Sequence, residues 1–462
     1  MKKLPITGFK AAREYLNFVR DPVAAMRSMH ERYGPIVALG PAPVGGTNRP
    51  HVLAIGPEFN RQVLGDPATF RPTGLLLRGP KDSAQRRVRF GLTRMTGAQH
   101  KEQRQLVMPA FHSTAVRTYH DQMVGVVSEI VEGLRPGRHE ILAVLRLLTL
   151  RAASTIHFSH DPAEALPLGQ MLQQWVLRNF SPAVRLFPLN FPGTPFHDYL
   201  RLAERIERKI LELIAKRRAK PGTYNDVLAL LIEARDEEGS RMTDTELVGQ
   251  TAVLFSASME TTSTAMMWTL FLLAQHPAVM NDVMNELDTV LKGGVPTPEQ
   301  LRQLRLLNFV IKESMRVLAP VPYTVRSTTS TVSIGPYRVP DGTRVVCSHF
   351  LTHHLPELYP EPNRFRPERW NSIDPNQYEY LPFSAGPRVC IGAAFATQLM
   401  LISLAMMLQK FRFSVVPGTR IDRIVRITMQ PRGGLPMLVC PNDRNFAASK
   451  VHGQIHEMVD LP

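Results

Sequence analysis

The sequence predicts a mainly helical protein with a small β portion, an α+β fold class, in one domain spanning residues 1–462. An apolar period typical of helices dominates from about residue 100 to 320 and returns over 393–409. Short apolar runs typical of strands lie in three places, about 30–60, 320–350 and 410–440. The length alone would favour two or three domains, but no change in composition marks a linker.

Composition indicates an ordinary globular chain, with 44% hydrophobic and 21% charged residues. The three cysteines, Cys347, Cys390 and Cys440, are far apart and odd in number, so they do not form a disulfide framework. They fit a reducing cytosol. Lys10 and Arg13 precede any apolar stretch, so we expect neither a signal peptide nor a membrane anchor. A soluble, cytoplasmic protein is predicted.

The net charge of +15, from 55 Lys and Arg against 40 Asp and Glu, favours an acidic protein, a nucleic acid or an anionic membrane surface as partner. Two basic runs, residues 86–89 and 216–220, are interpreted as solvated faces. Neither contains aromatic residues, and no nucleic-acid-binding motif accompanies them. We therefore expect no nucleic-acid partner.

The first elements in chain order are two short apolar runs, Ile36–Leu39 and Val52–Ile55, which predict a hairpin. An amphipathic helix follows later, with charges opposite one apolar stripe: Leu202, Ile206, Ile210 and Leu213.

A long apolar helix is expected next. The capping box Thr243–Glu246 begins it, and His276-Pro277 ends it. Its polar residues, Glu260 among them, suit a buried functional helix better than a lipid-facing one. Thr297-Pro298 predicts another helix start.

The last third returns to short strands and ends its helical part with Ala393–Gln409. The expected β segments are Thr331–Ile334, Arg344–Cys347, Phe411–Val416 and Ile424–Met429. Between them, the Pro-rich stretch Pro356–Arg369 is expected to be irregular.

One ten-residue segment carries the strongest chemical signal. Cys390 stands in an apolar turn between glycines, two residues after Arg388 and just before a helical pattern. A thiolate on a metal needs small neighbours, and the first N–H groups of a following helix stabilise it. The segment resembles the haem-ligand signature of the cytochrome P-450 family, Phe-x-x-Gly-x-Arg-x-Cys-x-Gly. All its fixed positions are met, namely by Phe383, Gly386, Arg388, Cys390 and Gly392. The alternative is an inert buried cysteine.

The resemblance implies the cytochrome P-450 fold, with a long central helix over a haem and the Cys loop beneath it. It implies haem b (iron protoporphyrin IX) with Cys390 as the axial thiolate ligand and Phe383 and Gly392 beside it. His100, Arg104, Arg326 and Arg388 match positions that contact the haem propionates. For Arg326, a strand-edge arginine is the alternative.

A second constellation is Glu313 with Arg316, one turn apart on a largely apolar helix. The family pairs them with a later arginine, here Arg369, into a structural triad. A carboxylate between two forked donors would fix the chain below the haem.

Catalysis is assigned to Glu260 and Thr261, which match the acid-alcohol pair on the family's central helix. The pair is expected to deliver protons during reduction of dioxygen. Ser258 stands where the family usually has Gly, which affects pocket volume and the proton path. The structural alternative is that Thr261 bonds a carbonyl four residues earlier while Glu260 pairs with a buried Arg.

The implied activity is insertion of one oxygen atom from O2 into a small hydrophobic substrate such as a terpenoid, steroid or fatty acid, by hydroxylation or epoxidation. The resemblance places four segments around the substrate: Thr73–Leu77, Trp175–Phe187, Val321–Val325 and Ile427-Thr428. Each is apolar enough to be plain core.

Electrons are expected from an acidic ferredoxin or flavodoxin with its reductase, because no flavin or nicotinamide domain fits in the chain. Two alternatives stay open. One is a peroxide-driven or substrate-rearranging haem-thiolate enzyme, and the other is a haem-thiolate binding or sensing protein without turnover.

Overall fold

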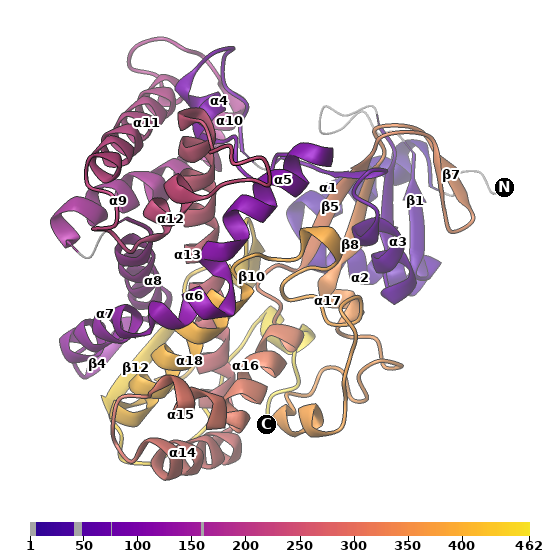
Figure 1. Cartoon of the computed structure of the whole chain (residues 1–462). Helices are drawn as coiled ribbons and strands as arrows, with labels where there is room; N and C mark the ends of the chain where they lie inside the picture. Colours follow the sequence, from indigo (N-terminus) through magenta and orange to yellow (C-terminus); the bar gives the residue numbers. More distant parts are fainter. Residues whose placement is uncertain (1–5, 41–48, 75, 159–160) are drawn as a thin grey trace.

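The largest sheet joins strands from the N-terminal region to strands beyond residue 320 (Figure 1). The computed structural model describes residues 6–40, 49–74, 76–158 and 161–462. In spatial order the sheet contains β1 (Ile36–Leu39), β2 (His51–Ala54), β8 (Arg344–Ser348), β5 (Tyr323–Thr328) and β3 (Phe70–Pro72). β1 pairs antiparallel with β2, with Ile36 opposite Ala54, so the predicted hairpin is confirmed. β2 pairs parallel with β8.

The remaining strands form three small sheets. These are β4 (Gly137–Glu140), β12 (Pro436–Pro441) and β9 (Phe411–Val415); β6 (Val332–Ile334) with β7 (Tyr337–Val339); and β10 (Arg423–Val425) with β11 (Met429–Pro431). The expectation of one β segment over Ile424–Met429 is wrong. The chain turns back at residues 426–428, so that Val425 lies opposite Met429 in an antiparallel hairpin.

Helices make up most of the rest of the chain. Up to residue 233 they are α1 (Gly8–Arg20), α2 (Pro22–Tyr33), α3 (Pro57–Gly65), α4 (Ala84–Val88), α5 (Gly97–Val107), α6 (Ser113–Thr118), α7 (His120–Gly133), α8 (Ile141–Phe158), α9 (Pro162–Asn179), α10 (Pro182–Leu186), α11 (Pro195–Ala219) and α12 (Val227–Glu233). The later ones are α13 (Asp244–Gln275), α14 (Pro277–Leu291), α15 (Pro298–Gln303), α16 (Arg305–Val317), α17 (His349–Thr352) and α18 (Ala393–Lys410). Short 3₁₀ turns cover Met108–Phe111, Pro367–Asn371, Gly386–Arg388 and Gln454–Glu457.

The long helix α13 runs through the helical part and packs against α8, α4, α16 and α18 (Figure 1). Its predicted capping box is confirmed: Thr243 N donates to Glu246 Oε2 (2.9 Å), and Glu246 N donates to Thr243 Oγ1 (3.3 Å). The helix ends at Gln275 because Pro277 begins α14 and disfavours helical backbone at His276. It is apolar on nearly all sides, which is typical of a helix in the core.

Two predicted solvated faces are only partly solvated. Within residues 216–220, the Arg217 side chain is buried and pairs with Asp226, Nη2 to Oδ2 2.7 Å. Within residues 86–89, Arg89 is only 7% exposed. A one-dimensional charge run does not show which of its members a neighbouring helix covers, so the prediction is wrong for these two residues.

Among the described residues, α8 and α18 are long and apolar enough to span a membrane by length and composition. In the folded chain, 67% of the α8 stretch and 61% of the α18 stretch are buried inside the protein, as in core helices.

Candidate active site

The loop before α18 holds Cys390 in a closed turn. Cys390 N donates a hydrogen bond to Phe383 O (2.8 Å). Gly386 has φ +70°, and a Cβ there would overlap the Leu64 carbonyl, so only glycine fits. Burial raises the pKa of the Cys390 thiol, whereas the Gly392 backbone N–H and the Arg104 guanidinium lower it. The Gly392 N–H and the positive charge of Arg104 act in favour of the thiolate form that binds a metal, but burial is the larger effect and the pKa of the thiol is raised.

Cys390 faces a cavity of about 280 Å³ enclosed by α13 on one side and the Cys loop on the other. The α13 residues Ala257, Ser258 and Thr261 line it together with Phe383 and Cys390. Most of the cavity surface is apolar, with Leu254, Val321, Phe395 and Met400 among its walls. The structure thus brings the expected thiolate and the expected catalytic alcohol to one enclosed space.

Glu260 lies against a different cavity, of about 620 Å³, which Arg146 and Gln430 also line. Its carboxylate accepts from Arg146 Nε (3.1 Å, to Oε2) and Gln430 Nε2 (3.0 Å, to Oε1). Thr261 Oγ1 donates to Ala257 O (3.0 Å), four residues earlier. The Thr261 bond is that of the structural alternative described from sequence, whereas the arginine that pairs with Glu260 is only partly buried. The two neighbours Glu260 and Thr261 therefore face separate spaces.

The segments expected around a substrate divide between these cavities. Val321 and Thr324 line the cavity at Cys390, whereas Phe180 and Ile427 line the larger one. Trp175 is fully buried, and its Nε1 donates to Gln85 Oε1 (2.7 Å), so it belongs to the core. In the expected segment Thr73–Leu77, residue 75 lies outside the described residues.

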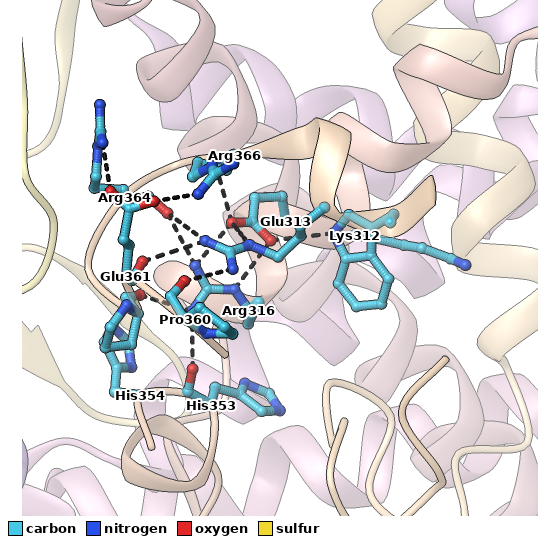
Figure 2. Close-up of polar contacts among 12 residues, drawn as sticks. Lys312, Glu313, Arg316, His353, His354, Pro360, Glu361, Arg364 and Arg366 are labelled. Atoms are coloured by element: carbon cyan, nitrogen blue, oxygen red, sulfur yellow. Dashed lines mark hydrogen bonds and ion pairs between the residues drawn. The ribbon is translucent and has the colours of Figure 1, made fainter. Parts of the chain in front are cut away.

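Glu313, Arg316 and Arg369 come together in a buried ionic network. Figure 2 shows Glu313 beside Arg316. Arg316 donates through Nη2 to Glu313 Oε1 (2.7 Å) and through Nε to Oε2 (2.9 Å). Arg369 Nε donates to Oε1 (2.9 Å). The side chains of Glu313 and Arg316 are 0% exposed, so the pair is completely removed from solvent.

The remaining guanidinium donors bind backbone carbonyls of the irregular stretch before Trp370. Arg316 Nη1 donates to His353 O (2.8 Å) and Pro362 O (2.7 Å), and Arg369 Nη1 donates to Pro360 O (2.7 Å). Figure 2 shows Arg316 between Glu313 and His353. The network joins α16 to the chain leading to the Cys loop.

The sequence matches the family model described as Cytochrome P450 over residues 11–437. It is 32% identical to cyclooctat-9-en-7-ol 5-monooxygenase of Streptomyces melanosporofaciens, over 84% of this chain and 85% of that protein. It is 30% identical to cytokinin hydroxylase of Arabidopsis thaliana, over 76% of this chain and 72% of that protein.

The chain belongs to the cytochrome P450 family. The solved structure of retinoic acid-bound cyanobacterial CYP120A1 has the same fold, with a TM-score of 0.81 at 23% identity, over 95% of this chain and all of that one. Cytochromes P450 are haem-thiolate oxidoreductases, and the chain is therefore a monooxygenase by family. The predicted P450 fold is confirmed.

The residues at the cavity fit a haem carboxylate pair. Arg388 lines the cavity, and His100, Arg104 and Arg326 interact with it electrostatically from nearby. None of these four residues forms an ion pair with a carboxylate of the described chain. Burial and the neighbouring Arg388 and Arg104 lower the pKa of His100 to about 4. Burial and the charges of Arg326 and Arg104 lower the pKa of Arg388 to about 10, and its buried Nε has no partner. Such a cluster lacks the anions that would compensate it.

Sequence reasoning missed two partners of the predicted residues. Arg146, on α8, and Gln430, on β11, hold Glu260. For Arg146 the sequence did contain a signal: it is the single arginine in the apolar run Ile141–Leu150, and a charge there needs a buried partner. Nothing local to Gln430 indicated its contact across 170 positions of sequence.

Proposed function

We propose that this P450 inserts one oxygen atom from O2 into a hydrophobic substrate, by hydroxylation or epoxidation, with electrons from a separate redox protein. The observation that carries the proposal is the enclosed apolar cavity that Cys390 and Thr261 share. We further propose that residues 1–462 act as one haem domain, because residues of the helical part and of the later loops line the same cavity. The three cysteines are free, which supports a cytoplasmic location.

Cys390 would hold the iron of haem b through its thiolate, with Phe383 and Gly392 beside it in the Cys loop. His100, Arg104, Arg326 and Arg388 would hold the two propionates, which supply the charge that this cluster lacks. When bound, a thiolate-ligated haem supplies the activation of dioxygen and the oxygen-transfer chemistry. Glu313, Arg316 and Arg369 would have a structural role, fixing the chain that precedes the Cys loop.

Thr261 Oγ1 would donate protons into the cavity at Cys390. Its hydroxyl donates to Ala257 O (3.0 Å), and Thr261 lines the cavity. Glu260, in the larger cavity with Arg146 and Gln430, would take up protons from solvent and pass them to Thr261. A positioned donor of this kind contributes about a hundred- to ten-thousand-fold in rate. Ser258, whose Oγ donates to Phe255 O (2.8 Å), occupies part of the same space.

The substrate is expected to be largely hydrophobic, because the walls of the cavity offer mostly apolar side chains. Cyclooctat-9-en-7-ol, the compound in the name of one relative, is the first compound to test. Terpenoids, steroids and fatty acids of similar size form the wider panel.

An acidic ferredoxin or flavodoxin, with its reductase, is the proposed electron donor. A surface groove of about 740 Å³ lies beside the first turn of α18, which follows Cys390 by three residues. Arg117, Arg302 and Arg305 line it, and Leu301 and Phe309 add apolar surface. Positive charge around an apolar centre suits docking of an acidic protein.

The test is turnover under isotopically heavy dioxygen, with purified holoprotein, ferredoxin, reductase and reduced nicotinamide cofactor. The expected product carries one heavy oxygen atom and forms only when the donor is present. Equal product from hydrogen peroxide alone, or an isomer without added oxygen, would favour the enzymatic alternatives. Binding of the panel without any product would favour a sensing protein.

A further inference from the structure

Four arginines line a separate cavity of about 270 Å³ near the start of the helical part. They are Arg78, Arg86, Arg89 and Arg94, and Phe90 completes the wall. We call this cavity the arginine pocket. It lies at α4 and the residues on either side of it, where α4 packs against α11 and α13. No acidic residue of the described chain lines it.

The charges in the arginine pocket have no carboxylate counterion among the residues that the structure describes. None of its four arginines forms an ion pair with an Asp or Glu in the described part of the chain. Arg87, on the same helix, provides the contrast because it points elsewhere and donates two hydrogen bonds to the Glu207 carboxylate. The Arg87 side chain outside the pocket thus has a carboxylate partner, whereas the arginines inside it have none in the described chain; Arg86 donates only to the backbone carbonyls of Gly79 and Pro80.

Arg89 is the arginine of the pocket for which a missing counterion costs most. Its side chain is buried, with 7% of the residue exposed, and its Nε has no hydrogen-bond partner. Burial, together with the positive charges of Arg94, Arg78 and Arg86, lowers the pKa of Arg89 to about 10. A buried guanidinium among three others is costly unless an anion compensates it. Gly74 leaves the room for this arrangement, because a Cβ there would overlap the Arg94 guanidinium.

The arginine pocket is distinct from the cluster of basic residues that is expected to hold the haem propionates. The cavity at Cys390 and the arginine pocket share no lining residue. The charges that lower the pKa of Arg388 come from Arg326 and Arg104, and those that lower the pKa of Arg89 come from within the arginine pocket. The haem propionates would therefore leave the arginine pocket uncompensated.

We propose that the arginine pocket binds an oxyanion with two or more negative charges, of the phosphate or diphosphate class. Planar guanidinium groups bind such oxyanions through paired hydrogen bonds. A single carboxylate would neutralise only one of the four cations. The phosphate group has two possible sources, a free anion or the polar end of a larger ligand, and its recognition is the same in both.

The experiment is calorimetric titration of the holoenzyme with inorganic pyrophosphate at low and high salt. Wild type should bind, and Arg89→Gln and Arg78→Gln should bind about tenfold or more weakly, because each removes a charge-assisted hydrogen bond. Arg205→Gln, at an exposed arginine of α11, is the matched control and should bind like wild type. Equal affinity in all four proteins, or no binding by wild type, would overturn the proposal.

Arg78 is exposed, so Arg78→Gln keeps the test valid if Arg89→Gln folds poorly. Pyrophosphate binding requires no turnover, and its failure would leave the proposed function standing. A second titration, with an alkyl diphosphate, separates the two sources. If the alkyl diphosphate shifts the Soret band, and Arg89→Gln weakens that shift, the phosphate is the polar end of a ligand that reaches the cavity at Cys390. Binding without a shift, equal to that of pyrophosphate, would identify a free anion at a separate site.

Discussion

The Glu260 carboxylate is held by the Arg146 guanidinium, with Nε 3.1 Å from Oε2, and faces a different cavity from the one that Thr261 lines. Any proton that passes from Glu260 to Thr261 must therefore move from one cavity to the other. The acid and the alcohol would act in sequence, with the acid facing the larger cavity and the alcohol facing Cys390.

Thr261→Ala should keep haem and substrate binding but divert reducing equivalents into hydrogen peroxide. Removing the Oγ1 donor leaves a cavity wall of similar shape without its proton source. The measurement is product and peroxide formed per reduced nicotinamide consumed. Ser258→Gly is the control and should couple electrons to product as wild type does. Full coupling in Thr261→Ala with poor coupling in Ser258→Gly would transfer the donor role to Ser258.

Arg369→Ala should greatly reduce the yield of folded holoprotein. Glu313 is completely buried, and it would lose one of its two cationic partners, at a cost of about 3–5 kcal/mol. Haem content per mole of purified protein and denaturant unfolding measure the effect. Arg366→Ala, which removes a side chain that pairs with Glu368 at the surface, is the control and should give normal yield. Normal haem content in Arg369→Ala would contradict the structural role of the triad.

His157→Phe should make the protein less sensitive to acid. Burial alone, among the rings of Phe111, Phe255 and Phe395, lowers the pKa of His157 to about 3 from an ordinary value of 6.5. Between these values the unfolded state binds a proton that the folded state does not, so stability falls as pH falls. In this range, each unit by which the pH falls lowers the free energy of unfolding of wild type by about 1.4 kcal/mol through His157.

The measurement is the free energy of unfolding of wild type and His157→Phe at several pH values from 7 to about 4. The difference between the two should shift in favour of the variant as pH falls. His452→Gln, at an exposed histidine, is the control and should follow wild type. A difference that stays constant with pH would show that His157 contributes nothing to acid sensitivity.

Much of the fold could be predicted because its signals are local. Thr243 and Glu246 define the start of α13 within four residues, and the spacing around Cys390 defines its loop. The partners of Glu260 could not be predicted, because Arg146 lies 114 positions away on another helix. The expectation that Arg89 is solvated fails for the same reason. Only packing of α4 against α11 and α13 buries it, and no local pattern encodes that contact.

Reduction by an acidic ferredoxin should slow steeply as salt rises. Steering between exposed charges is screened over about 8–10 Å at physiological ionic strength. Arg117→Glu, in the groove beside α18, should slow reduction further at low salt, as measured by stopped-flow absorbance. Arg205→Glu is the control, since α11 lies at the opposite end of the helical part from α15 (Figure 1). A rate independent of salt, or unchanged in Arg117→Glu, would exclude docking at this groove.

The central claim is that Cys390 is the haem ligand, and the most direct measurement is the absorbance spectrum of the reduced carbon monoxide complex. Wild type should show the red-shifted Soret band of thiolate ligation, and Cys390→Ser should lose it. Cys440→Ser, at a cysteine in a strand away from the cavity, should keep the band. A wild-type Soret band typical of histidine ligation, or a thiolate band that survives in Cys390→Ser, would contradict the account.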